Sequence, residues 1–123
     1  MSVPENLQYT KDHEWAQVQG GVAIIGITDH AQRELGDIVF VELPKMSSQL
    51  TAGQSFGTIE AVKTVAELYA PVAGVVTEVN STLASDAGVI NQDPYGKGWI
   101  IKISVEKSAA HELMSAAEYE KLI

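Results

Sequence analysis

Short runs rich in valine and isoleucine recur along most of this chain, and turn residues such as glycine, proline and asparagine bound them. Such runs are typical of β-strands, because β-branched side chains fit a pleated surface and turn residues end each strand. Strands this short and this closely spaced predict a β-sandwich or a flattened barrel. The predicted strands cover residues 9–19, 22–28, 38–41, 54–60, 64–70, 74–79 and 99–105.

Helical patterns are short and lie mainly near the C-terminus. Asp29 to Leu35 predicts one brief helix, with Asp29 as the N-cap and Gly36 at its end. Beyond residue 107 the chain is rich in Ala, Leu, Glu and Lys, which predicts two further helices at 109–113 and 116–122. Residues 91–98 are expected to form a loop, because this segment contains a proline and two glycines. We expect one domain over residues 1–123, with a core at about 8–106 and a helical appendage at about 108–123.

The composition excludes several classes of function. A formal net charge of −8 with a single arginine, Arg33, counts against nucleic-acid binding, which requires clustered positive charge. The chain has no cysteine, so thiolate metal sites and cysteine nucleophiles are absent.

No stretch approaches the roughly 20 apolar residues that cross a membrane, and residues 1–10 contain no secretory or transit pattern. We expect a monomer in the bacterial cytoplasm, although a processed mitochondrial protein would have the same features.

The most informative segment places one lysine between two predicted strands. Residues 54–60 and 64–70 flank Lys63, so a hairpin would present this lysine at its tip. Pro71 and Gly74 then break the second strand. An isolated exposed lysine is usually a solubilising charge, and its sequence context is what makes Lys63 a candidate for modification.

That context resembles the modified-lysine signature of lipoyl and biotinyl carrier domains. The signature consists of Glu60, Lys63 three positions later, and Gly74. Biotinyl carriers usually have methionine on both sides of the lysine, whereas Val62 and Thr64 stand there in this chain. The resemblance implies that Glu60, Val62 and Gly74 are read by the enzyme that modifies Lys63.

A longer set of motifs is similar to the glycine cleavage system H proteins. The motifs span nearly the whole chain and occur in the family's order: Tyr9-Thr10, 12–15, 26–32, 35–44, Asn91, 93–95 and Gly98-Trp99. The chain departs from the family at Ala61, where serine is usual, at Thr64, where alanine is usual, and at 46–48, where a glycine is usual.

This resemblance implies a mostly-β fold of the lipoyl-domain type, the barrel-sandwich hybrid, with lipoate joined covalently to Lys63. It also implies a non-catalytic carrier in glycine catabolism and one-carbon metabolism. The lipoyl group would carry an aminomethyl group and reducing equivalents between glycine decarboxylase, aminomethyltransferase and dihydrolipoamide dehydrogenase. A lipoate-attaching enzyme would be a further partner.

The lipoyl group and the Lys63 side chain together form a long arm. The resemblance further implies that this arm, when it carries the aminomethyl group, docks in a surface cleft where carboxylates bind the ammonium of that group. Glu14 and Glu67 match acidic positions of the family, and Glu34 is a third candidate at a position where some members have histidine. Taken singly, each of these residues is more often a solvated surface carboxylate. His13, His30 and His111 lack the spacing of metal ligands, so no metal site is expected.

Other functions stay open at this stage. A lysine that acts as a base or Schiff-base nucleophile needs burial or neighbouring positive charge, and Lys63 has Glu60 and Glu67 nearby instead. A protein that relays lipoyl groups to other complexes would share every feature above. A biotinyl carrier is the third alternative.

Overall fold

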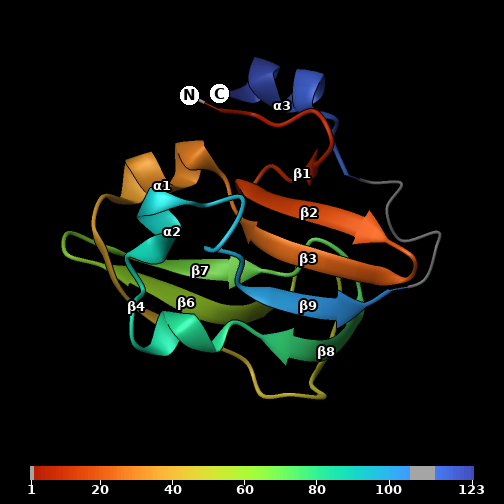
Figure 1. The fold of residues 1–123 in the computed structure, drawn as a ribbon. Coiled ribbons are helices and arrows are strands. Elements are labelled where there is room, and N and C mark those ends of the chain that lie inside the picture. The colour runs from red at the N-terminus through yellow and green to blue at the C-terminus, as the bar shows by residue number, and fades with distance from the viewer. Residues whose placement is uncertain (1, 106–112) are drawn as a thin grey trace.

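The computed structural model describes residues 2–105 and 113–123, whose strands form two antiparallel sheets (Figure 1). One sheet has six strands in the order β1-β2-β3-β9-β8-β5, and the other has three in the order β4-β6-β7. The sheets stay open, so the predicted mostly-β fold is confirmed as a sandwich and not a closed barrel. The strands are β1 (Gln8–Tyr9), β2 (Glu14–Gln19), β3 (Val22–Ile27), β4 (Ile38–Glu42), β5 (Gln49–Leu50), β6 (Ser55–Ala61), β7 (Val65–Tyr69), β8 (Gly74–Val79) and β9 (Ile101–Ser104).

Short helices connect and cover the strands. They are α1 (Asp29–Leu35), the 3-10 helix η1 (Ser81–Ala84), α2 (Val89–Gln92) and α3 (Ala116–Leu122). The prediction that Asp29 caps α1 was wrong, because Thr28 is the N-cap and its hydroxyl accepts a hydrogen bond from the Ala31 amide at 3.1 Å. The predicted end at Gly36 is confirmed. None of the described helices is both long and apolar enough to cross a membrane.

Two local predictions need correction, and two short elements were missed. Residues 9–19 form two strands, because the chain turns at 10–13, where His13 has a φ of 66° and its amide donates to the Thr10 carbonyl at 3.1 Å. Residues 91 and 92 are helical and belong to α2, and β5 and η1 were not predicted. The helix predicted at 109–113 lies outside the described residues except for Leu113. The strand β5 and the helices η1 and α2 are too short to leave a periodic signal in the sequence.

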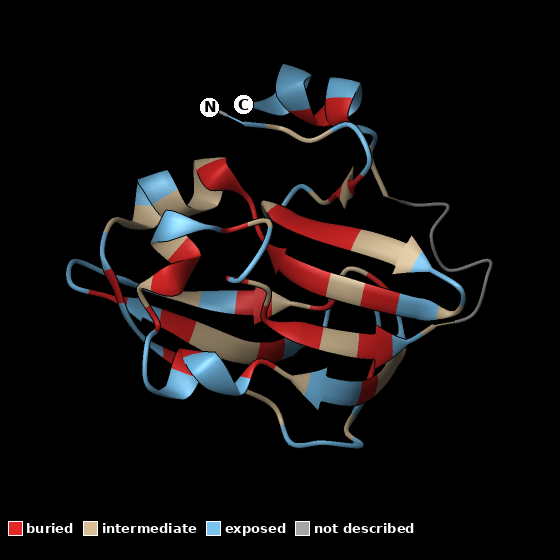
Figure 2. Ribbon diagram, viewed as in Figure 1, coloured by how far each residue is buried: buried red, intermediate tan, exposed pale blue. Residues whose placement is uncertain are grey.

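Two hydrophobic clusters stabilise the fold, and the larger one lies between the sheets (Figure 2). A second cluster, formed by Leu7, Tyr9, Trp15, Ala116 and Tyr119, packs α3 onto the other face of the six-stranded sheet. The Tyr9 and Tyr119 rings stack with centroids 4.8 Å apart, and both residues are fully buried. As a result, the first residues of β2 are buried on both faces of the sheet.

Candidate functional site

Lys63 lies in the turn that joins β6 to β7. Glu60 pairs with Val65 across the hairpin, and the Ala61 amide donates to the Thr64 carbonyl at 2.8 Å. Val62 and Lys63 therefore form the tip, and both are exposed. The structure thus has Lys63 at the predicted place, on a two-stranded support.

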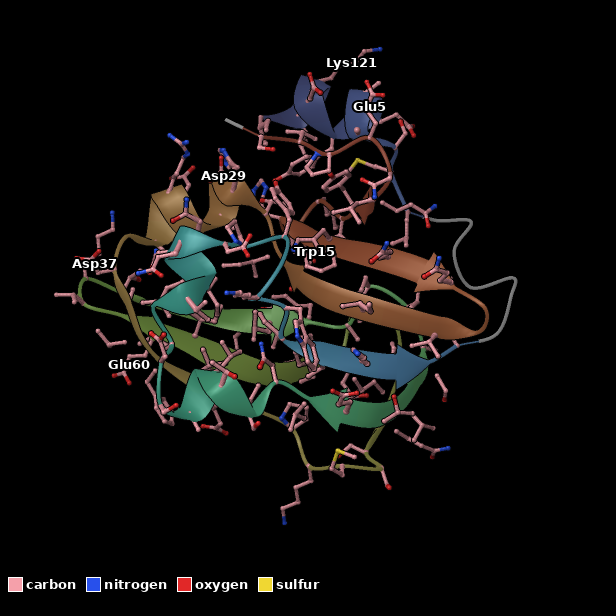
Figure 3. All side chains as sticks on the ribbon, in the orientation of Figure 1. Glu5, Trp15, Asp29, Asp37, Glu60 and Lys121 are labelled. Atoms are coloured by element: carbon pink, nitrogen blue, oxygen red, sulfur yellow. The ribbon has the colours of Figure 1, made fainter. Side chains whose placement is uncertain are left out.

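The connection between α1 and β4 supports this turn from one side. The Val62 amide donates to the Asp37 carbonyl at 2.9 Å. The alkyl chain of Lys63 lies against Gly36, where an added Cβ would be 3.3 Å from Lys63 Cε. Gly36 also has a φ of 77°, a conformation that glycine adopts without strain. Figure 3 shows Asp37 and Glu60 at the same end of the molecule as this turn.

A cavity of about 190 Å³ lies between α1, the start of β2 and the free edge of β7. The last turn of α1 lines part of this cavity and ends directly before Gly36, the glycine against which Lys63 lies. The apolar side chains are Ile27, Ala31, Leu35, Ile59, Ala66 and Leu68, and the polar ones are Asp12, His13, Glu14, Glu34 and Glu67. All three carboxylates predicted for an arm-docking cleft therefore line this one cavity.

Glu14 is the most unusual of the three, because only 2% of its surface is exposed. Glu14 Oε2 accepts a hydrogen bond from the Tyr69 amide at 2.7 Å, on the free edge of β7. Glu14 Oε1 has no partner among the described residues. Burial raises the pKa of Glu14 from an ordinary 4.5 to about 8, and the hydrogen bond from Tyr69 opposes this only in part. An unpaired buried oxygen is costly, so Glu14 is suited to a ligand that donates a hydrogen bond.

We expect Glu14 to make the protein less stable as the pH rises. Between its unfolded pKa near 4.5 and its folded pKa of about 8, the folded state binds one proton more than the unfolded state. The contribution of Glu14 to the free energy of unfolding should therefore fall by about 1.4 kcal/mol per pH unit in this window. Glu14→Gln keeps an acceptor for Tyr69 and should lack this slope. Urea denaturation of both proteins from pH 5 to 8 tests the prediction, and parallel profiles would contradict it.

Glu34 and Glu67 are more exposed and already have partners. Glu34 Oε1 lies 3.1 Å from His30 Nε2, and 69% of the Glu34 side chain is accessible. The Glu67 carboxylate accepts a hydrogen bond from the Ser55 hydroxyl. Glu67 alternates along β7 with two residues that are less exposed, Ala66 and Leu68. Glu14 is therefore the carboxylate best placed to bind a ligand deep in the cavity.

His13 lines this cavity and His30 packs against His13, an arrangement that the sequence did not indicate. The His13 and His30 rings lie 4.7 Å apart, and His13 Nδ1 is 2.8 Å from the Tyr119 hydroxyl. Burial and the neighbouring His30 lower the pKa of His13, so His13 is neutral at neutral pH. The same Tyr119 hydroxyl bonds Thr28, the N-cap of α1, at 2.8 Å. Only the fold could reveal this cluster, because its members come from three distant segments.

An exposed apolar row beside Lys63 also escaped the sequence analysis. Phe40, Glu60 and Val65 are neighbours across β4, β6 and β7, and antiparallel partners point to the same face. Phe40 is 50% exposed, Val65 61% and Val62 75%. The sheet beside Lys63 therefore presents three large apolar side chains to solvent.

Gly74 lies away from Lys63, in the six-stranded sheet. A Cβ at this position would be 2.2 Å from the Ser104 carbonyl oxygen of β9, so the close approach of β8 to β9 requires glycine. Packing therefore explains Gly74 independently of any modifying enzyme. Within the described part of the chain, no cluster of three or more His, Asp or Glu side chains could hold a metal ion.

Comparisons with known proteins agree with this geometry. A family model described as the glycine cleavage H-protein matches residues 7–123. The glycine cleavage system H protein of Chlorobium limicola is 56% identical over 126 residues, which cover 100% of this chain and 98% of that protein. The H protein of Herpetosiphon aurantiacus is 51% identical over 122 residues, which cover 99% and 94%. A crystal structure of a glycine cleavage system H protein from Mycobacterium marinum has a TM-score of 0.89 and 39% identity, over 97% of each chain.

Proposed function

The chain belongs to the glycine cleavage H-protein family, and on that premise we propose that Lys63 is the residue that carries its lipoyl group. The family provides the glycine cleavage system with a lipoyl carrier that has no catalytic activity of its own, and this chain has that role. The attachment site, the docking cleft and the individual partners are our proposals.

The position of Lys63 is the observation that carries the proposal. Its amine lies on an exposed turn that two strands and the α1–β4 connection hold in place. A lipoyl-lysine arm is on the order of 14 Å long from backbone to ring. The end of the Lys63 side chain lies next to Gly36, and Leu35, the residue before Gly36, lines the cavity. Such an arm can therefore extend into a partner's active site or fold back into its own protein.

The residues of the cavity fit this arm. When bound, the lipoyl group supplies a disulfide that accepts two electrons and an aminomethyl fragment. The apolar walls would bury the chain and ring and exclude water. Glu14 Oε1 would accept a hydrogen bond from an ammonium cargo, which would lower the pKa of Glu14 again because a cation favours the ionised carboxylate. Glu34 and Glu67 would add negative charge nearer the entrance.

The partners would bind the apolar row around the turn. Any enzyme that acts on the Lys63 amine must cover Val62, and Glu60 lies between the exposed Phe40 and Val65. We propose that the lipoate-attaching enzyme reads Glu60 and Val62 there, whereas Gly74 contributes through the fold. The same face would bind three enzymes one after another, because each of them acts on the same lipoyl-lysine arm: glycine decarboxylase, aminomethyltransferase and dihydrolipoamide dehydrogenase.

The intact mass of the purified protein tests the proposal, after expression with lipoate and biotin both supplied. A gain equal to one lipoyl group supports it, and a biotin-sized gain would indicate a biotinyl carrier instead. No gain under good supply would refute the modification of Lys63. A modified protein that supports lipoyl transfer to other complexes but not glycine decarboxylase activity would be a lipoyl relay.

We further propose that the chain acts as a monomer and a single domain in the bacterial cytoplasm. Its relatives are bacterial proteins that match it over nearly their full length. The packing of α3 on β1 supports one domain, because both ends of the described chain join the same cluster.

A further inference from the structure

We infer that Asn91 positions the Lys63 turn, and this inference rests on the proposed function of Lys63. Asn91 lies in α2, and its side chain holds the α1–β4 connection from both sides. Asn91 Nδ2 donates to the Gly36 carbonyl at 2.8 Å, and Asn91 Oδ1 accepts from the Ile38 amide at 2.9 Å. The same Nδ2 donates to Gln32 Oε1 in α1 at 3.0 Å. One amide group therefore fixes residues 36–38 relative to α1.

Residues 36–38, which Asn91 holds, are the segment that supports the Lys63 turn. Asp37 stands between the two residues that Asn91 holds, and its carbonyl accepts the Val62 amide at 2.9 Å. Gly36 provides the surface against which the Lys63 alkyl chain lies. Two contacts thus lead from Asn91 to Lys63, one through a backbone hydrogen bond and one through packing. A shift of residues 36–38 would move the turn and this surface together.

The hydrogen bonds of Asn91 to residues 36–38 also fix Lys63 relative to the cavity. The last turn of α1 lines the cavity through Glu34 and Leu35 and ends at Gly36, which Asn91 holds. Attachment requires the lysine amine to meet an activated acyl group in another protein, and small misplacements of reacting groups slow such steps strongly. Asn91 is therefore a positioning residue, which acts through residues 36–38 and touches no reacting atom.

The chain offers a closely matched control in Asn80. Asn80 Nδ2 donates to the Lys97 and Trp99 carbonyls at 2.9 and 2.7 Å, and Asn80 Oδ1 accepts from the Thr82 amide at 3.3 Å. Both asparagines therefore donate twice and accept one backbone amide. Asn80 is the more buried of the two, and it supports the 97–99 loop instead of residues 36–38. Replacing it should disturb folding at least as much as replacing Asn91.

The test compares Asn91→Asp with Asn80→Asp in the full chain. Aspartate cannot donate, so each variant loses two hydrogen bonds and gains one negative charge. For Asn91→Asp we expect the Val62 amide to exchange hydrogen about tenfold faster, and kcat/KM for lipoyl attachment to fall about tenfold. For Asn80→Asp both quantities should stay within about twofold of the wild type. Exchange is measured by NMR on the unmodified protein, and attachment by intact mass over time.

A second pair of variants keeps the test decisive if Asn91→Asp does not fold. Val62→Pro removes the amide that donates to Asp37, whereas Val62→Ala keeps it and loses most of the side chain. Because the attaching enzyme also contacts the Val62 side chain, Val62→Ala should itself lower kcat/KM, and a clearly larger fall for Val62→Pro supports the inference. Equal effects in the two asparagine variants, or in the two Val62 variants, overturn it. A wild-type protein that is never modified would instead refute the proposed function.

Discussion

Replacing Lys63 with arginine is expected to give a folded protein that gains no lipoyl mass and no longer supports glycine decarboxylase. The guanidinium group keeps the positive charge, but it is not an amine that the attaching enzyme can acylate. Stability should change by less than about 0.5 kcal/mol, because this position is exposed. Intact mass after expression with lipoate, thermal denaturation and an assay with added glycine decarboxylase measure the three quantities.

Lys45→Arg is the matched control for this experiment. Lys45 is also an exposed lysine outside the strands, and its replacement should leave the mass gain and the decarboxylase assay unchanged. A lipoyl gain that persists in Lys63→Arg would place the arm on another lysine. In that case the cavity beside α1 would need a different occupant.

Replacing Gly74 with alanine is expected to lower the free energy of unfolding by about 3 kcal/mol. The new methyl carbon would lie 2.2 Å from the Ser104 carbonyl oxygen and 3.2 Å from Ile103 Cδ1, so β8 and β9 must separate locally. Denaturant unfolding measures the loss. The rate of lipoyl attachment to the folded fraction should not change, because Gly74 lies in the six-stranded sheet and Lys63 lies in a turn of the three-stranded one.

Gly53→Ala serves as a control that separates crowding from backbone strain. Gly53 has a φ of 83°, but no atom lies within 4 Å of an added Cβ. Alanine there should cost about 1 kcal/mol through strain alone. Equal losses in the two variants would contradict a steric role for Gly74. Slower attachment to folded Gly74→Ala would instead favour direct recognition of this glycine.

Local patterns in the sequence were sufficient to predict the Lys63 hairpin. The turn lies between two β-branched runs, and each strand's partner is its neighbour in the chain, so no distant segment decides the arrangement. The helix at 29–35 followed in the same way from its glycine end. Its cap was misassigned because Thr28 and Asp29 are both good N-cap residues, and only the fold shows that Tyr119 also bonds Thr28.

Burial of the site residues could not be predicted. An alternating pattern exposes one face of a strand, but Glu14, Trp15 and Ala16 are all buried, because α3 covers the second face of β2. The sequence therefore named Glu14 only through family resemblance and could not show its unpaired oxygen. Similarly, the sequence did not show that Phe40 and Val65 are exposed, because their exposure depends on β4, β6 and β7 forming a sheet with one open face.

The open face beside Lys63 also affects how densely this carrier can be concentrated. Its apolar row lies next to a second row that carries Glu42 and Glu67, and the whole chain has a net charge of −8. Two copies that met through these faces would bring their carboxylates together, and like charges repel over about one Debye length, roughly 8 Å at physiological salt. Acylation of Lys63 would make the tip more apolar but would also make each copy one unit more negative. The modification would therefore strengthen attraction and repulsion between copies together, and we expect any tendency to self-associate to rise with the ionic strength of the medium.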